Sequence, residues 1–355
     1  MTELWTTGIA HANHAPRMAA RAEAAGWDGM TVVDSQNLSG DTFVALALAA
    51  KETSDLLLGT GVTNPATRHP AACAAGIASV HVASGGRARL GIGRGDSALA
   101  HLGLAPATVD DLGAYVRIVR AYLRGEDVPF ADLRPYEHAD AKPVATLGLA
   151  DTPAQSRMHW LPRDLDPVPV EVVATGPKVL ELAGRDADRV LLAVGADPER
   201  VGWAMDHARA AGATQFAAFV NVVTHPDIDM ARTLGAGGMS LFARFSSMDG
   251  KVRTPIDAES EAVLHKVHDA YDMNDHSRAG SAQASQLTAG FVDRFGIVGP
   301  PDHCIARLQQ LIDLGVDRLI IVGPSADADR EEARRARDLF ENEVLTAMKE
   351  HANVA

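Results

Sequence analysis

The sequence repeats one unit about eight times: a short apolar run, a turn, and a longer alanine-rich segment of helical period. Apolar runs without polar alternation are typical of parallel strands buried on both faces, and the segments between them are typical of crossover helices. About eight such units in a chain of 355 residues predict a closed (β/α)₈ barrel, also called a TIM barrel. Because no linker interrupts the pattern, we expect a single domain over residues 1–355.

The positions of the expected elements follow from this rhythm. Strands are predicted at residues 5–10, 29–34, 56–63, 87–93, 168–175, 189–194, 215–223 and 317–322, and helices at 16–25, 41–53, 70–83, 108–124, 177–184, 197–211, 301–314 and 327–348. Two segments do not fit the repeat: residues 125–167 are rich in proline, and residues 236–296 are rich in glycine and then polar. We expect both to lie on loops at the carboxyl ends of the strands, where barrel enzymes build their substrate pockets.

Composition excludes several classes of function. The formal net charge of -13 opposes binding to nucleic acid. No apolar run approaches the roughly 20 residues of a membrane span, and the first residues lack the pattern of a secretory signal, so we expect a cytoplasmic protein without a membrane partner. Cys73 and Cys304 stand far apart and no HExxH spacing occurs, which predicts neither a disulfide nor a metal site.

Glycine-containing turns follow the third and fourth predicted strands. The first, GTGVTNPATRHP at residues 59–70, allows the backbone to approach a flat ligand, although an ordinary strand-to-helix loop explains it equally well. The second, LGIGRGDS at residues 90–97, can expose backbone N–H groups to a ligand edge, and its spacing differs from the dinucleotide fingerprint. Asp96 in this turn is a candidate acid, and capping of the following helix explains it as well.

Two strand ends in the second half of the chain carry turns suited to phosphate. ATGP at residues 174–177 runs from a strand into a helix, whose free N–H groups and positive dipole end attract anions. VGAD at residues 194–197 repeats the arrangement at the next strand, in the half of a barrel where phosphate sites are common. His11 directly follows the first strand, and an imidazole pKa near neutrality makes it a candidate general acid or base.

In this order and with this spacing, the glycine motifs resemble the luciferase-like superfamily of flavin- and deazaflavin-dependent oxidoreductases. GTGVTNPATRHP followed by LGIGRGDSALAHLG is especially similar to methylenetetrahydromethanopterin reductases and related enzymes that use coenzyme F420. The resemblance covers nearly the whole chain, through ATGPKVLELAGRDADRVLLAVG to the final RLIIVG. It implies hydride transfer between a deazaflavin or flavin and a small organic substrate, in a protein that forms a homodimer.

The resemblance also implies roles for single residues. The Gly61-Val62 peptide matches a non-prolyl cis bond that backs the central ring of the cofactor. Asp34 matches a carboxylate near the ring system, and the loop from Gly93 to Ser97 matches the loop along its edge. Asp96 matches an acid that handles a proton during hydride transfer.

The turns at residues 174–177 and 194–196 match the family's phosphate-binding turns, and Arg68, Arg94 and Lys178 are candidate contacts for an acidic cofactor tail. The candidate catalytic residues are His11 and Asp96. The candidate cofactor-binding residues are Asp34, Gly61, Val62, Thr63, Asn64, Gly93, Arg94, Gly95, Ser97, Ala174, Thr175, Gly176, Pro177, Val194, Gly195 and Ala196.

The chain departs from the reductases at two places. They carry a glutamate after the first strand, where this chain has Ala10 and His11, and Asp34 is followed by Ser35 instead of a frequent histidine. These departures argue against a pterin substrate. Three functions stay open: an oxidoreductase that uses F420, a monooxygenase that uses oxygen and reduced FMN delivered by a partner flavin reductase, and a non-catalytic flavin or deazaflavin binder on the same fold.

Overall fold

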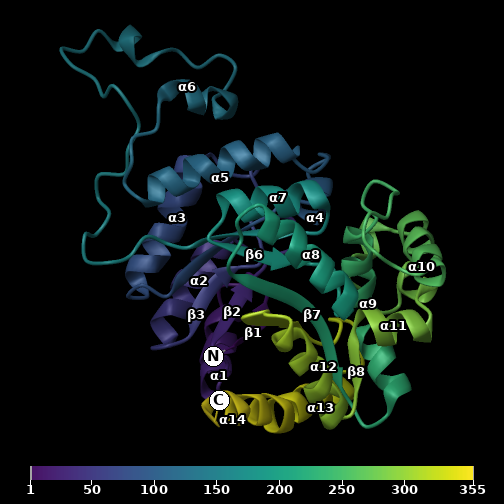
Figure 1. Ribbon diagram of the computed structural model, residues 1–355. Helices are drawn as coiled ribbons and strands as arrows, with labels where there is room; N and C mark the ends of the chain where they lie inside the picture. Colours follow the sequence, from purple (N-terminus) through teal and green to yellow (C-terminus); the bar gives the residue numbers. More distant parts are fainter. Residues whose placement is uncertain (1, 355) are drawn as a thin grey trace.

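In the computed structural model, which describes residues 2–354, parallel strands close into a barrel (Figure 1). They pair in chain order from β1 to β7, and β9 closes the ring between β7 and β1. This arrangement confirms the predicted (β/α)₈ fold. The strands of the ring are β1 (Glu3–Gly8), β2 (Gly29–Val32), β3 (Leu57–Thr60), β4 (Ala88–Ile92), β5 (Val170–Ala174), β6 (Arg189–Leu192), β7 (Phe216–Thr224) and β9 (Arg318–Val322).

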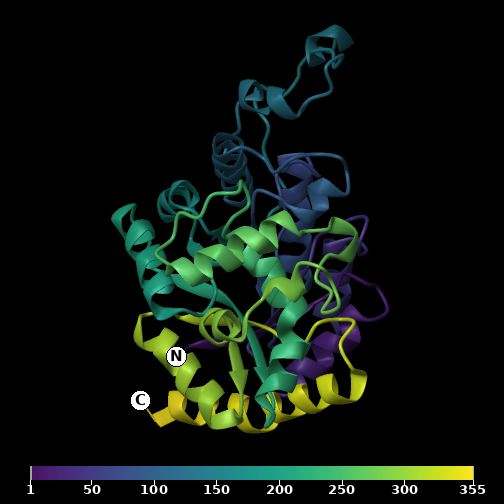
Figure 2. The same ribbon diagram turned by 90° about the vertical axis from the view of Figure 1, so that its right-hand side faces the viewer.

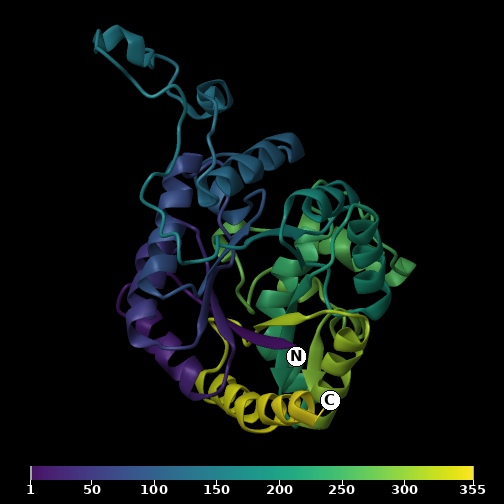
Figure 3. The ribbon, with the colours of Figure 1, turned by 60° about the vertical axis from the view of Figure 1, so that its left-hand side comes forward.

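Helices form a ring around the strands (Figure 3). Pro70, Pro177, Pro198 and Pro301 each occupy a first helical position, where a missing N–H leaves no hydrogen bond unmade. The outer helices are α1 (Ala15–Ala24), α2 (Thr42–Glu52), α3 (Pro70–Ala83), α5 (Val109–Leu123), α7 (Pro177–Asp186), α8 (Pro198–Ala210), α12 (Pro301–Asp313), α13 (Arg330–Leu339) and α14 (Thr346–Val354), the last two joined by a π-helical turn at Phe340–Leu345.

A charged network lies inside the barrel near the amino ends of its strands. The guanidinium of Arg318 donates to Glu3 and Glu171, both at 2.6 Å, and stands 4.1 Å from the ring centroid of the fully buried Trp5. Burial alone would raise the pKa of Glu3, but the charges of Arg318 and Arg189 and the hydrogen bonds from Arg318 and Trp5 together lower it. Because buried charges are tolerated only when paired, these contacts hold β1, β5 and β9 in one register.

The segment at residues 125–167 connects α5 to β5 and includes α6 (Phe130–Leu133). A connection from a helix to a strand begins and ends at the amino-terminal face of the barrel. Contacts from Asp166 to His81 and from Pro169 to Leu90 lie at that face. The prediction that this segment lies at the catalytic face is therefore wrong, and much of it projects away from the barrel (Figure 2).

The second insertion follows β7 and so lies at the carboxyl ends of the strands, as predicted. It is largely helical, with α9 (Ile228–Phe245), α10 (Ala258–Asp269) and α11 (Ala289–Phe295) side by side (Figure 1). A short strand that the sequence did not predict, β8 (Ile297–Gly299), follows α11 and pairs with the last residues of β7.

Helix α9 covers the interior of the barrel from the carboxyl-terminal side. Phe242 packs against Phe219 of β7, with ring centroids 5.8 Å apart, and shares an apolar cluster with Trp5. Glycine disfavours helices by about 1 kcal/mol, which is why the sequence TLGAGGMS gives no helical signal. Gly237 is needed for packing, because a Cβ there would lie 2.4 Å from the carbonyl oxygen of Ser277.

We expect Gly237→Ala to destabilise the protein by about 1–3 kcal/mol, since the added methyl group collides with backbone that cannot move aside. Gly202→Ala in α8 is the matched control: a Cβ there meets nothing within 4 Å, so it should stabilise by about 0.5–1 kcal/mol. Urea denaturation measures both. Equal stability of the two variants would contradict the packing of α9 described here.

Candidate active site

The peptide between Gly61 and Val62 is cis, as the resemblance implied. The side chain of Val62 fills space beside β4, because a Cβ on Gly93 would lie 3.0 Å from its Cγ2 atom. The N–H of Gly93 donates to the carbonyl of Thr63, at 2.9 Å. A Cβ on Gly93 would also lie 2.6 Å from Cγ1 of Val173, so packing on both sides requires glycine here. The prediction that Gly93 exposes its N–H to a ligand is wrong, because Thr63 accepts that N–H.

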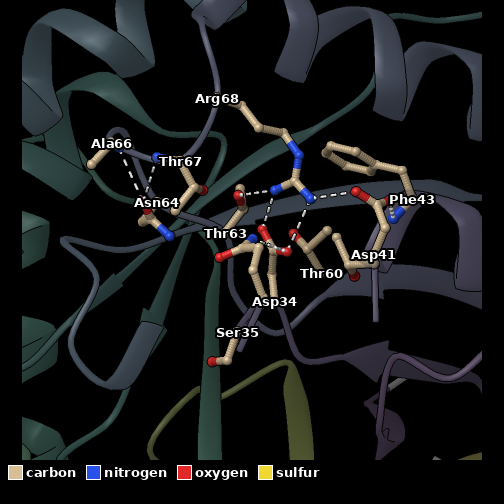
Figure 4. Close-up of polar contacts among 12 residues, drawn as sticks. Asp34, Ser35, Asp41, Phe43, Thr60, Thr63, Asn64, Ala66, Thr67 and Arg68 are labelled. Atoms are coloured by element: carbon tan, nitrogen blue, oxygen red, sulfur yellow. Dashed lines mark hydrogen bonds and ion pairs between the residues drawn. The ribbon is translucent and has the colours of Figure 1, made fainter. Parts of the chain in front are cut away.

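Asp34 is buried and paired with an arginine from the next loop (Figure 4). Arg68 contacts both oxygens of Asp34, at 2.5 and 3.1 Å, and also Asp41 at 2.8 Å. Burial alone would lower the pKa of Arg68, but the two carboxylates raise it above its ordinary value. The carboxylate of Asp34 thus fixes the loop after β3, and Arg68 is engaged by protein and does not extend to a cofactor tail.

Buried polar atoms without a partner occur in the loops after β2 and β3 and on β7 where it leaves its pairing with β9. In Asn64, Oδ1 accepts the N–H groups of Ala66 and Thr67, but Nδ2 has no hydrogen-bond partner among the described residues (Figure 4). The same holds for Oε1 of Gln36, after β2, and for Nδ2 of Asn221, on β7. Leaving such an atom unpaired costs about 1–3 kcal/mol, so these atoms mark a place where a ligand or water completes the structure.

The two candidate catalytic residues have different surroundings. Asp96 precedes α4 (Ser97–Ala100) but its side chain does not cap that helix, so the capping explanation is wrong. Its carboxylate is paired with Arg244 of α9 and is only 11% exposed. His11 is exposed, and its Nδ1 accepts the N–H of Asn13 at 3.2 Å.

The two predicted phosphate turns also differ. At residues 174–177 the turn is partly exposed, α7 starts without a side-chain cap, and a Cβ on Gly176 would meet open space. At residues 194–196 the turn is buried: the N–H of Ala196 donates to Phe295 at 2.7 Å, and a Cβ on Gly195 would lie 2.8 Å from the Phe295 ring. Helix α11 therefore covers Val194, Gly195 and Ala196, and the open turn is the one that precedes α7.

The loop after β4 has its own anchors. Gly95 adopts a positive φ of 78°, and the guanidinium of Arg94 donates to the carbonyl of Ala107, so Arg94 is held along the loop.

Sequence reasoning missed three residues of the second insertion that lie beside Asp96: Arg244, Tyr271 and His276. The polar residues of that insertion were the available signal, but no motif shows which of them meet.

Among residues 2–350, whose side chains the structure describes, no group of three or more His, Cys, Asp or Glu side chains is arranged to hold a metal ion. No described helix combines the length and the apolar character needed to cross a membrane.

A model of the family described as luciferase-like monooxygenase matches residues 2–318. The chain belongs to the luciferase-like monooxygenase family. This luciferase-like protein is 28% identical over 335 residues to the 5,10-methylenetetrahydromethanopterin reductase of Methanolobus tindarius, an alignment that covers 85% of this chain and 88% of the relative.

Two solved structures share the fold of this luciferase-like protein. The coenzyme F420 dependent tetrahydromethanopterin reductase from Methanopyrus kandleri matches with a TM-score of 0.69 and 22% identity, covering 98% of this chain and 99% of that one. The oxygenating constituent of 3,6-diketocamphane monooxygenase from Pseudomonas putida, in complex with FMN, matches with a TM-score of 0.62 and 19% identity, covering 97% and 98%.

In this luciferase-like protein, Arg68→Met should lower the free energy of unfolding by about 3–5 kcal/mol, because it leaves the fully buried Asp34 carboxylate without a counter-ion. The double variant Asp34→Asn/Arg68→Met removes both charges and should recover much of that loss. Thermal and urea denaturation of the three proteins measure the difference. A single variant as stable as the double one would show that the pair does not hold the loop.

Proposed function

We propose that this enzyme binds coenzyme F420 at the carboxyl-terminal mouth of its barrel and transfers a hydride between it and a small organic substrate. The observation that carries the proposal is the set of unpartnered polar atoms on Gln36, Asn64 and Asn221. Two amide donors and one acceptor, in the loops after β2 and β3 and on β7, suit the carbonyl and N–H edge of a planar ring system. The F420-dependent reductase that shares the fold supports the same cofactor.

Each part of the chain has a proposed task. The bulge at Gly61 and Val62, followed by Thr63, backs the ring system, and the loop from Gly93 to Ser97 flanks its edge. The open turn at residues 174–177 takes a phosphate on the N–H groups of α7. When bound, the cofactor supplies the hydride chemistry, while the protein supplies orientation and a proton donor.

The second candidate function is an FMN-dependent monooxygenase that receives reduced flavin from a partner reductase and uses oxygen. The FMN-bound monooxygenase component that shares the fold favours it, because the same platform suits both ring systems. Calorimetric titration with F420 and with FMN separates the two candidates. F420 binding together with anaerobic substrate turnover supports the first, and FMN binding with oxygen consumption supports the second.

Asn64→Asp tests the cofactor site. The aspartate keeps the oxygen that accepts from Ala66 and Thr67 but replaces the free donor by an acceptor. Losing one buried hydrogen bond of about 1–3 kcal/mol lowers cofactor affinity roughly 5- to 150-fold. Asn342→Asp, the same change on an exposed residue of the outer helices, should leave the affinity unaltered. Wild-type affinity in Asn64→Asp would remove Asn64 from the site.

We further propose that the enzyme is a homodimer joined through α2 and α3. Val44 and Leu48 lie one turn apart on α2 with 53% and 41% of their surface exposed, and Val82 of the adjacent α3 is 44% exposed. Helix α3 carries no Asp, Glu, Lys or Arg, which is unusual for an outer helix in water. An apolar outer face of this kind is typical of an interface.

Leu48→Glu should convert the dimer into a monomer, because it places a charge in the apolar contact. Leu147→Glu makes the same change at a residue that is 66% exposed on the segment between α5 and β5, and should leave the dimer intact. Analytical ultracentrifugation measures both. A monomeric wild-type protein, or a dimer that only Leu147→Glu disrupts, would contradict this interface.

A further inference from the structure

A structured segment between α10 and α11, residues 270–284, passes over α9 and is called the strap below. Its backbone at Ser277 packs directly on Gly237 of α9, and Ser277 itself has a positive φ of 61°. The N–H groups of Ala279 and Gly280 point to the carboxylate of Asp327, at 2.8 and 3.4 Å. Because Asp327 lies in the loop after β9, the strap is anchored at the carboxyl-terminal face of the barrel.

The strap carries a tyrosine and a histidine in direct contact. The hydroxyl of Tyr271 lies 2.9 Å from Nδ1 of His276. Burial lowers the pKa of His276 to about 4 and raises the pKa of Tyr271, so at neutral pH the imidazole is uncharged and the phenol keeps its proton. The phenol therefore donates to Nδ1, and the ring proton of His276 is on Nε2.

Charged groups from two other elements complete the cluster. The guanidinium of Arg244 stands 4.7 Å from the ring centroid of Tyr271 and pairs with Asp96 from the loop after β4. His101, whose Nε2 is buried without a partner among the described residues, also acts on the charge of His276. The charged and titratable groups facing His276 are thus Asp96, Arg244, His101 and Tyr271.

A catalytic proton donor needs a group that can give up a proton and a neighbour that can replace it. The cluster around His276 offers both, whereas the two candidate catalytic residues do not. The carboxylate of Asp96 is engaged by Arg244, and Nδ1 of His11 accepts a local backbone N–H on an exposed turn. Nε2 of His276 makes no protein hydrogen bond among the described residues, and, unlike His11, His276 has a phenol on Nδ1: Tyr271 can replace the proton from the opposite side of the ring.

We propose that His276 is the catalytic proton donor to a substrate oxygen, with Tyr271 as its positioning residue, so that the substrate is a carbonyl compound or the corresponding alcohol. The inference rests on the proposed function. During reduction, the carbonyl carbon would receive one hydride, whose two electrons the reduced cofactor would supply when bound. The oxygen takes the proton of His276 Nε2, His276 Nδ1 takes the proton of Tyr271, and solvent reprotonates the phenolate, which Arg244 stabilises meanwhile. Alcohol oxidation reverses each transfer.

The first test is kinetic and uses the full chain with F420, with acetone, cyclohexanone, acetophenone and their alcohols as probes. We expect His276→Gln to lower kcat about 10²- to 10⁴-fold with KM changed only a few-fold, the usual contribution of a general acid. Tyr271→Phe should lower kcat less and alter the pH profile of kcat, because the proton supply to Nδ1 is lost. His265→Gln, on the partly exposed side of α10, is the matched control and should match wild type.

The second test does not depend on activity. Nitrogen NMR of histidine-labelled protein without cofactor, assigned by comparison with His276→Gln, should show His276 protonated on Nε2 and uncharged from neutral pH down to about 4. Tyr271→Phe should change that tautomer population. A purely structural Tyr271–His276 contact would lower melting temperature in the variants and leave the pH profile of kcat unchanged.

The experiments distinguish failure of the proposed function from failure of the role proposed for His276. Absence of F420 binding by wild type in calorimetry removes the proposed function, and this inference with it. Binding without turnover of any carbonyl or alcohol probe, or wild-type kcat in His276→Gln across the pH range, overturns the inference alone. Should His276→Gln fail to fold, an unaltered pH profile and an unaltered tautomer in Tyr271→Phe overturn it equally.

Discussion

The length of β7 determines which segments can lie at the mouth of this barrel. Its first part pairs within the ring, with β6 from Phe216 to Ala218 and with β9 from Ala217 to Asn221, and its last residues, Val222 to Thr224, pair with β8. The strand thereby extends beyond the ring, and the chain that follows it has room to lay α9 over the barrel interior. Arg244 and the strap reach the loop after β4 only because α9 takes this path.

Charge pairs secure both ends of the barrel in a chain of net charge -13. Arg318 joins strands at the amino-terminal end, and Arg68 joins two loops at the carboxyl-terminal end. A buried ion pair is weak evidence for stability, but removing one partner leaves an uncompensated charge, so these contacts restrict which conformations the loops can adopt. Asp34 and Asp96, the two carboxylates predicted to lie at the cofactor site, are each paired with an arginine.

Periodicity was sufficient for the fold, because a barrel's strands and outer helices each bury a fixed face. The strands and outer helices of the barrel and the side that carries the second insertion followed from local pattern. The cis peptide at Gly61 followed from family resemblance and not from the residues alone. One failure was topological: residues 125–167 run from a helix to a strand, so they begin and end at the amino-terminal face. Another depended on contacts distant in sequence: the glycines of α9 lie in a helix, where Gly237 leaves room for the strap.

The site was predictable in position and less so in detail. Asp34 and Asp96 follow the strands after which the sequence motifs placed them. Neither motif indicates that Asp34 forms an ion pair with Arg68 or that Asp96 forms one with Arg244. Asn64 was predicted as a cofactor contact, and its free amide agrees with that role without testing it. Tyr271 and His276 are five residues apart in a segment without repeat or motif, so only the folded chain brings out their contact.

The projecting segment between α5 and β5 has one further consequence. At its base, Val128 pairs with Ser156, and the hydroxyl of Tyr122 on α5 donates to Ser156 at 2.7 Å. These contacts hold the two ends of the segment together beside α5. The proposed active site is at the opposite rim, and residues 129–155 belong to none of the described strands. The tip is accordingly a place where a fluorophore, an affinity handle or a fused domain can be attached without disturbing catalysis.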